Sequence, residues 1–181
     1  MKSSLSIFSK QLNRSVSSGR VSKAWLSSAP PRQLNVAFGL KKEDETHAFH
    51  ELAQQPVTAL QGIGPKHEAL LESLNIKTIE QLSKYKFFHL ARSIKTLSTI
   101  EEAGGRLEGS TMNLDKGLDK DYEHMHFAEL LDAPVDALSG ISEEKGKLWN
   151  SLGVKTVGDL ADYKFCKWSE AITTAVKYEK K

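Results

Sequence analysis

Apolar residues in the middle of the chain recur every three or four positions, which is the spacing of one face of an α-helix. This spacing predicts three successive helices after Gly62. A shorter helix is expected before them, opened by Pro56 and ended by Gly62, because proline suits the first helical turn and glycine suits a helix end. No strand of convincing length appears, so the sequence predicts an all-α fold. The inward positions of the three helices are Leu70, Leu71 and Leu74; Ile79, Leu82 and Tyr85; and Phe87, Leu90, Ile94 and Leu97.

The same pattern returns 78 residues later, and the segment 49–94 aligns with 127–172 without a gap. Asn75 lies opposite Gly153, and both residues tolerate the left-handed backbone that ends a helix. We call these segments the first copy and the second copy, and we interpret them as two copies of one helical module. Identical pairs include Pro56/Pro134, Gly62/Gly140, Ile63/Ile141, Leu74/Leu152, Thr78/Thr156, Tyr85/Tyr163 and Phe87/Phe165.

In each copy, a threonine marks the start of the second of the three helices that follow the hairpin glycine. Thr78 is followed by Gln81 three positions later, and Thr156 is followed by Asp159. Both threonines are expected to be N-caps, but only the first pair matches the capping box, which requires Glu or Gln at that position.

These signals divide the chain into five parts. Two helical domains are expected at 44–99 and 123–181, and they are joined by a linker at 100–122 that contains four glycines and scattered charges. Residues 29–43, which begin Ala-Pro-Pro, are expected to form a flexible lead.

Residues 1–28 form the fifth part and differ in composition from the rest. Their apolar residues Leu5, Phe8, Leu12 and Val16 fall on one helical face, and no Asp or Glu occurs before residue 43. An amphipathic, acid-free segment that contains Ser and Arg is typical of an organelle transit peptide, whereas a secretory signal needs a longer apolar core. The stripe favours mitochondria, with plastids as the alternative, and a disordered basic tail is the remaining interpretation.

Charge and composition exclude several classes of protein. The chain has 25 Lys and Arg, eight of them in residues 1–42, so 17 remain against all 23 Asp and Glu in 43–181 and give that region a net charge of −6. The single cysteine, Cys166, leaves no intrachain disulfide and no Cys-rich zinc site. No apolar run approaches the roughly 20 residues of a membrane-spanning helix, so no transmembrane segment is expected.

The candidate catalytic groups do not form a recognisable constellation. His47 and His50 have helical spacing, but no acidic or cysteine partner lies at a fixed offset from them, so surface histidines are expected. Cys166 lies beside cations without a His/Asp arrangement, and its counterpart is Phe88, which indicates a partly buried thiol. The chain also lacks a phosphate loop and a dinucleotide fingerprint. The sequence therefore predicts no enzyme activity, no metal site and no cofactor.

The segment 60–71, LQGIGPKHEALL, resembles the helix-hairpin-helix motif, and the two copies together resemble tandem helix-hairpin-helix domains of cyanobacterial, algal and organellar proteins. The resemblance implies two helices joined by the turn Gly62-Ile63-Gly64, with Ile63 between them and Pro65 starting the second helix. In members that bind nucleic acid, the amides of this turn hold a phosphate, and a lysine such as Lys66 assists. In other members the hairpin serves only protein packing.

The second copy departs from that pattern. Its turn reads Gly140-Ile141-Ser142 and is followed by Glu143 and Glu144. Two carboxylates suit a helix N-terminus, and Ser142 can cap it, but they would repel a phosphate. The second hairpin is therefore expected to be structural.

Two functions remain open. The net charge and the absent site residues favour a non-catalytic protein-interaction module, an accessory subunit of an organellar assembly such as a respiratory or photosynthetic complex or a ribosome. Trp25 and Trp168 are its candidate contact residues. The alternative is an organellar nucleic-acid-binding protein that uses the first hairpin together with nearby cations. Those cations are Lys66, Lys77, Lys84, Lys86, Arg92 and Lys95.

Overall fold

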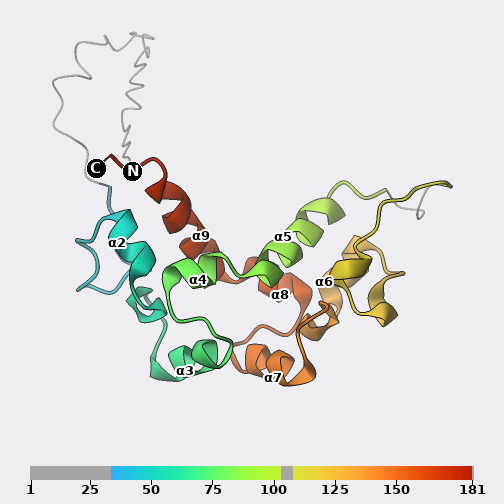
Figure 1. Cartoon of the computed structure of the whole chain (residues 1–181), viewed down its shortest axis with the longest axis horizontal. Helices are drawn as coiled ribbons and strands as arrows, with labels where there is room; N and C mark the ends of the chain where they lie inside the picture. Colours follow the sequence, from blue (N-terminus) through green and yellow to red (C-terminus); the bar gives the residue numbers. More distant parts are fainter. Residues whose placement is uncertain (1–33, 103–107, 181) are drawn as a thin grey trace, which may run out of the picture. The chain divides into compact units, whose positions relative to one another are not determined.

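Figure 1 shows the computed structural model, which describes residues 34–102 and 108–180. Within these ranges the chain consists of α-helices and short 3-10 helices and contains no strand, which confirms the predicted all-α class. None of the helices described is long and apolar enough to cross a membrane. The described residues from Asn35 onward belong to one compact unit.

The first half (34–102) and the second half (108–180) contain matching elements, and each α-helix of the second half begins 78 residues after its counterpart. The first half contains η1 (Ala37–Gly39), α2 (Phe49–Gln54), η2 (Val57–Ala59), α3 (Pro65–Ser73), α4 (Ile79–Ser83) and α5 (Lys86–Ser98). The second half contains η3 (Asp115–Gly117), η4 (Lys120–Tyr122), α6 (Phe127–Asp132), η5 (Val135–Ala137), α7 (Glu143–Ser151), α8 (Val157–Asp162) and α9 (Lys164–Val176).

Helix α2 precedes the position where the sequence analysis placed the first helix. Pro56 does not open an α-helix but has an extended backbone, with ψ 154°, before the 3-10 turn η2. The apolar spacing of Phe49, Leu52 and Ala53 is the signal for α2, and Leu52 and Ala53 are buried. The predicted first helix was therefore placed seven residues, about two turns, too late.

The caps of α4 and α8 are alike. Thr78 Oγ1 accepts from the Gln81 amide at 3.2 Å, and the side chain of Gln81 accepts from the Thr78 amide at 3.3 Å. The carboxylate of Asp159 accepts from the Thr156 amide at 3.0 Å, and its own amide donates to Thr156 Oγ1 at 3.0 Å. Expecting the capping box only in the first copy was therefore wrong, because Asp159 also reaches the N-cap amide. Backbone hydrogen bonds from Lys155 and Thr156 lower the pKa of Asp159.

The ends of α3 and α7 follow the sequence prediction. Asn75 has φ 61° and Gly153 has φ 83°, so both adopt the left-handed conformation expected of them.

Parts of the predicted lead and linker belong to the fold. Leu40 and Leu118 are buried, and the residue after each pairs with the following hairpin. The amide of Lys41 donates to the Ala59 carbonyl and that of Asp119 to the Ala137 carbonyl, both at 2.9 Å. These bonds hold η1 and η3 against the rest of each half, so the folded region begins earlier than the predicted bounds at 44 and 123.

The long last helix of each half packs against the opposite half. Helix α5 packs on α6 and α8, and α9 packs on α2 and α4. Figure 1 shows α9 beside α2 and α4, and α5 beside α6 and α8. Only Lys84 and Tyr85 separate α4 from α5, and only Tyr163 separates α8 from α9. Connections this short leave little chain with which to fold a long helix back onto its own half.

This exchange produces one shared hydrophobic core. Buried side chains from both halves form a single cluster, in which Phe88 of α5 and Ile172 of α9 lie beside residues of the opposite half's helices. Phe88 is fully buried, and its counterpart Cys166 is buried as completely. The two predicted modules therefore do not have separate cores.

Cutting the backbone between the halves should leave them associated. A site-specific protease sequence inserted at 103–107 allows the folded chain to be cleaved there. Because α5 and α9 each bury their apolar face in the other half, we expect the two fragments to elute together, at the mass of the intact chain, in size-exclusion chromatography with light scattering. Fragments that separate without denaturant would contradict the exchanged arrangement.

Candidate functional site

The hairpin turn of the first half has the backbone that its glycines suggest. Gly62 has φ 103°, a conformation that side chains with a Cβ rarely adopt. Ile63 is buried, and its amide donates to the Leu60 carbonyl at 3.2 Å. Gly64 is the N-cap of α3, and Pro65 is its first residue. The residues singled out in the sequence thus form one tight turn.

An aromatic side chain of the opposite half lies against one side of each hairpin glycine, and both glycines stay exposed on the other side. A methyl group added at Gly62 would lie 3.4 Å from Cζ of Phe165, and one added at Gly140 would lie 3.2 Å from Cζ of Phe87. The ammonium group before each ring lies over it, with Lys164 Nζ 4.8 Å from the Phe165 centroid and Lys86 Nζ 4.6 Å from that of Phe87. The phenylalanine of the Tyr-Lys-Phe sequence in each copy therefore contacts the hairpin glycine of the other copy.

An aromatic cluster joins the halves next to these turns. The indole of Trp149 is fully buried, and its Nε1 donates to the hydroxyl of Tyr85 at 3.0 Å. The rings of Trp149 and Tyr163 meet edge to face with centroids 5.4 Å apart, as do those of Tyr163 and Phe165. The cluster ends at His67, whose Nε2 lies 3.3 Å from the Tyr163 hydroxyl.

Burial sets the protonation of this cluster. It raises the pKa of Tyr85 to about 12 and also raises that of Tyr163. Burial, and secondly the charge of Lys164, lowers the pKa of His67. All three groups are therefore uncharged at neutral pH, which suits packing rather than binding an anion.

The two hairpins differ in how the following helix begins. Ser142 Oγ accepts from the Lys145 amide at 3.4 Å, and Glu143 pairs with Lys147 at 2.7 Å, so α7 is capped by its own side chains. Helix α3 has no side-chain cap at Gly64, and Lys66 is exposed. Of the two turns, only the first leaves its helix N-terminus without a side-chain cap.

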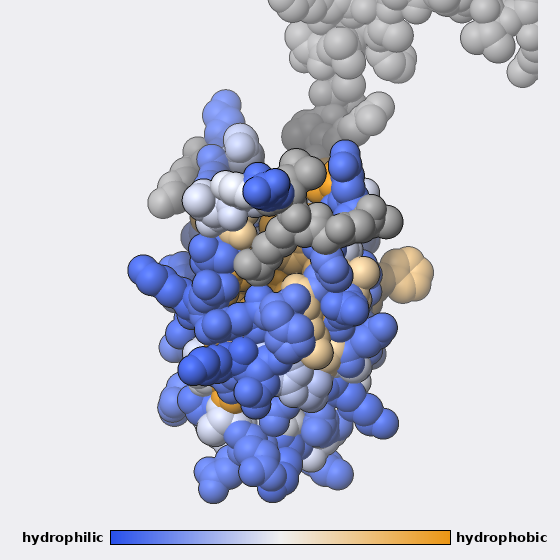
Figure 2. Space-filling model, turned by 90° about the vertical axis from the view of Figure 1, so that its right-hand side faces the viewer, coloured by the Kyte–Doolittle hydropathy of each residue, from blue (hydrophilic) through white to orange (hydrophobic). Residues whose placement is uncertain are grey.

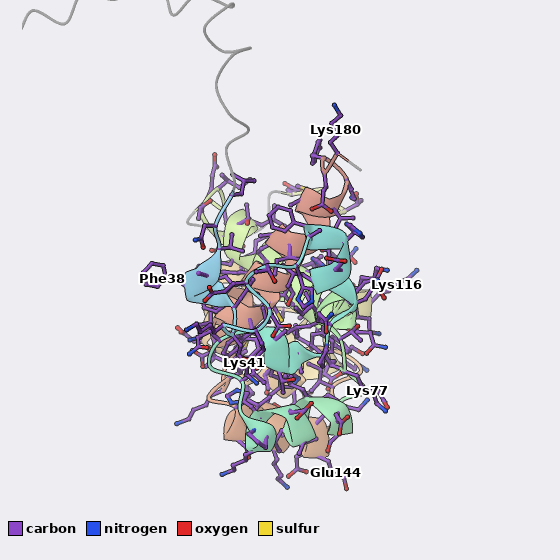
Figure 3. All side chains as sticks on the ribbon, turned by 90° about the vertical axis from the view of Figure 1, so that its left-hand side faces the viewer. Phe38, Lys41, Lys77, Lys116, Glu144 and Lys180 are labelled. Carbon is purple, nitrogen blue, oxygen red and sulfur yellow. The ribbon has the colours of Figure 1, made fainter. Side chains whose placement is uncertain are left out.

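Three of the six candidate cations near the first hairpin are paired with acids. Lys84 Nζ lies 2.6 Å from Glu80. Arg92 pairs with Glu170, which occupies the equivalent position of the second half, and Lys95 pairs with Asp162. Figure 3 shows Lys77 at the surface of the first half. Half of the expected basic face is therefore balanced by carboxylates, two of them from the second half.

The histidines and the cysteine are also occupied by structural contacts. His50 Nδ1 lies 2.6 Å from Glu179, and His126 Nδ1 lies 3.2 Å from Glu101. Within residues 34–102 and 108–180, no three His, Cys, Asp or Glu side chains are grouped so that they could hold a metal ion. Burial raises the pKa of the Cys166 thiol, which keeps it protonated. The expected partly buried thiol is in fact fully buried.

Large apolar side chains are exposed at places that the sequence analysis did not single out. Phe38 projects from η1 into solvent, as Figure 3 shows. Ile100, Met112 and Tyr178 are 75%, 83% and 83% exposed. Trp168 is partly buried against the core, and Trp25 lies outside the described residues. The sequence signal that could have indicated these exposed positions is an apolar residue outside the helical spacing, such as Phe38 or Met112.

Comparisons of the chain with protein-family models, with curated proteins and with solved structures found no match.

The contact at the first turn can be tested with neighbouring glycines. Gly62→Ala should lower the free energy of unfolding by about 1–3 kcal/mol, because alanine is strained at φ 103° and its methyl group meets Phe165. Gly64→Ala should change it by less than about 0.5 kcal/mol, because its φ is −97° and no atom lies within 4 Å of the added methyl group. Urea unfolding followed by circular dichroism measures both. Equal losses would contradict the assignment.

Tyr85→Phe should have an effect that depends on pH. At pH 7 it leaves the buried Trp149 N–H unpaired, which should cost about 1–3 kcal/mol. The pKa of Tyr85 is about 12 in the folded chain, above its unfolded value, so ionisation favours unfolding as the pH rises above about 10. The variant lacks this loss, so its deficit should shrink between pH 7 and pH 11.

Urea unfolding at both pH values measures that deficit, and Tyr178→Phe at an exposed position is the matched control. A deficit that stays constant would contradict the buried pairing of Tyr85.

Proposed function

We propose that the chain is a duplicated helix-hairpin-helix protein that acts as a non-catalytic protein-interaction module, an accessory subunit of a mitochondrial multiprotein complex. The observation that carries this proposal is the packing of Phe165 against Gly62 and of Phe87 against Gly140. One side of each hairpin turn is used for packing within the molecule, which favours other surfaces for contacts with partners.

The matching elements support the duplication. The α-helices of the two halves begin at a constant offset of 78 residues, and both hairpin glycines have φ near 102°. The isolated bridges between Leu40 and Leu60 and between Leu118 and Leu138 also correspond. A gene duplication that preserved one helical module accounts for these correspondences.

Charge favours protein partners over nucleic acid. Residues 43–181 carry a net charge of −6, and Arg92 and Lys95 are already paired with Glu170 and Asp162. Affinity for nucleic acid comes mainly from cations that neutralise phosphates. One observation favours the alternative function: the first hairpin leaves Gly64 uncovered and Lys66 exposed.

The location rests on residues 1–28, which lie outside the described residues. Their acid-free composition and their apolar spacing support import into mitochondria.

Binding to oligonucleotides should be weak and should not depend on Lys66. At physiological salt, the full chain should bind single- and double-stranded oligonucleotides no more tightly than the weak end of the non-specific range, about 10⁻⁴ M. Lys66→Glu, which introduces the residue found at the equivalent position 144, should leave this baseline unchanged. Salt-sensitive micromolar binding that Lys66→Glu abolishes would establish the nucleic-acid function instead.

A tagged full chain expressed in eukaryotic cells should be recovered from mitochondria in an assembly much heavier than its own 20.1 kDa. Because the proposed contacts are with protein, nuclease treatment should not change its position in a density gradient. A shift to the monomer position after nuclease, or recovery as a free monomer, would contradict the proposal. Recovery from plastids or cytosol would contradict the location alone.

A further inference from the structure

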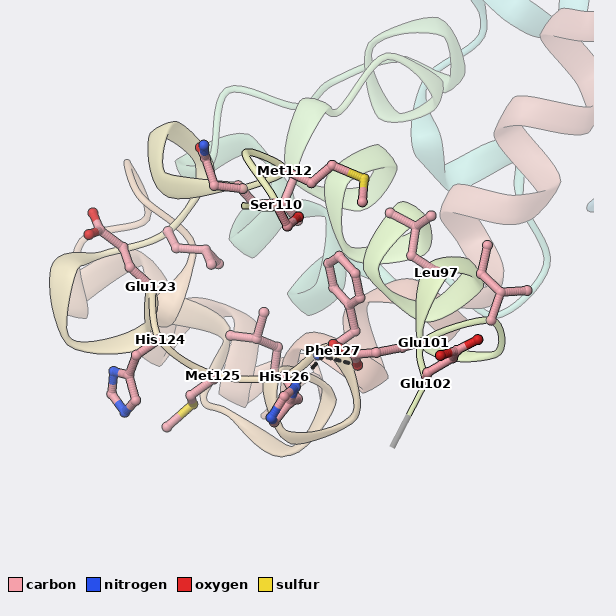
Figure 4. A pocket seen from close by; sticks show the side chains of 15 residues that line it. Leu97, Glu101, Glu102, Ser110, Met112, Glu123, His124, Met125, His126 and Phe127 are labelled. Carbon is pink, nitrogen blue, oxygen red and sulfur yellow. Dashed lines mark hydrogen bonds and ion pairs between the residues drawn. The ribbon is translucent and has the colours of Figure 1, made fainter. Parts of the chain in front are cut away.

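A large groove lies at the end of α5, where this helix meets the start of the second half. Its volume is about 810 Å³. Three segments supply most of its lining: the end of α5 with the residues after it, the loop before η3, and residues 123–127, which lead into α6. Figure 4 shows Leu97, Met112 and Phe127 approaching one another from these segments. The groove therefore exists only because α5 crosses into the second half.

The floor of the groove is apolar and partly solvent-exposed. Ile100 and Met112 are among the most exposed apolar side chains described, and Figure 2 shows apolar side chains in the middle of this otherwise hydrophilic face. Methionine adapts its shape to varied partners because its side chain is flexible and polarizable. The principal apolar lining residues are Leu97, Ile100, Met112, Leu114, Met125 and Phe127.

Three carboxylates and two histidines, His124 and His126, are the titratable side chains described in the groove lining. Glu101, Glu102 and Glu123 line it, and no Lys or Arg is found among its described lining residues. Glu101 also accepts hydrogen bonds from the Phe127 amide at 2.8 Å and contacts His126. Figure 4 shows Glu101 and Glu102 at one end of this apolar surface and Glu123 at the other.

The equivalent end of the first half has a different charge. Both ends keep a carboxylate that accepts from the first amide of the neighbouring helix, Glu179 from Phe49 and Glu101 from Phe127. The charges differ at two positions, where Lys177 and Lys180 stand opposite Thr99 and Glu102. Figure 3 shows Lys180 projecting from this end. Because the two ends have corresponding elements, the difference in side chains is specific to the groove.

We propose that this groove binds an amphipathic helix of a partner protein, one that has apolar residues along one face and Lys or Arg beside them. This deepens the proposed interaction function and rests on it. The apolar face of such a helix is buried against the methionine-containing floor, as in other helix-in-groove complexes. Its cations meet the carboxylates, which sets orientation and excludes acidic helices.

The probe is a fluorescein-labelled peptide of about four helical turns, made of Leu and Lys with Leu at positions i, i+3, i+4 and i+7. Fluorescence anisotropy with the full chain should show micromolar binding. The double variant Ile100→Asp/Met112→Asp should weaken it about tenfold or more. Tyr178→Asp, an equally exposed position at the other end, is the matched control and should leave binding unchanged.

Charge is tested on both molecules. Glu102→Lys, which introduces the residue found at position 180, should weaken binding of the Lys peptide severalfold, and a peptide with Glu in place of Lys should not bind. Equal binding of both peptides, or equal losses in the double variant and in Tyr178→Asp, would overturn the proposal.

Other occupants give different results. Concentration-dependent dimerisation of the chain, lost in the double variant, would mean that a second copy fills the groove. Peptide binding that occurs only after residues 1–28 are removed would mean that this segment fills it. Either result would overturn the proposal that a helix of a partner protein binds the groove. If the heavy nuclease-resistant assembly persists in the double variant while peptide binding is absent from the parent chain, the groove proposal fails and the proposed function stands.

Discussion

The exchange of the two long helices is the constraint on which the rest of the structure depends. Helices α5 and α9 follow the preceding helix after at most two residues, and each packs on the first and third α-helices of the opposite half. Their apolar faces are buried only in this arrangement. The free energy of the shared core therefore belongs to both halves together, and neither half has a complete hydrophobic core within its own sequence.

The same exchange determines what the hairpin turns do. The residue that starts each crossing helix is followed by a phenylalanine, and this ring lies against the hairpin glycine of the other half. A turn with a positive φ and no Cβ provides a surface close enough for an aromatic ring to contact the backbone. In the first half, the covering ring belongs to a cluster that continues through Tyr163 to Trp149 and Tyr85. Packing thus accounts for these glycines, for which the resemblance to the helix-hairpin-helix motif also allowed a phosphate site.

Once one side of each hairpin turn and half of the nearby cations are engaged internally, the ends of the long helices become the distinctive surfaces. The two ends carry corresponding elements but different side chains, with Glu102 and Ile100 at one and Lys180 and Tyr178 at the other. Two halves with matching helices and different ends can present two different surfaces. This is a suitable property for a module that joins different partners in one assembly.

The sequence by itself determined the helical class, the turns and most caps, because these depend on residues close together in the chain. Periodic apolar residues indicated α3, α4 and α5, the Thr78 cap was readable from Gln81, and the left-handed ends were readable from Asn75 and Gly153. The helix α2 had a readable signal in Phe49, Leu52 and Ala53, but the prolines drew the prediction to a later position.

Only the tertiary structure decided which half each long helix packs on, since the apolar face of α5 would suit either copy of so similar a module. The ring on Gly62, the pairing of Arg92 with Glu170 and the groove at Met112 all follow from that choice. They join residues far apart in sequence, and a periodic pattern records that a face is buried without recording its partner.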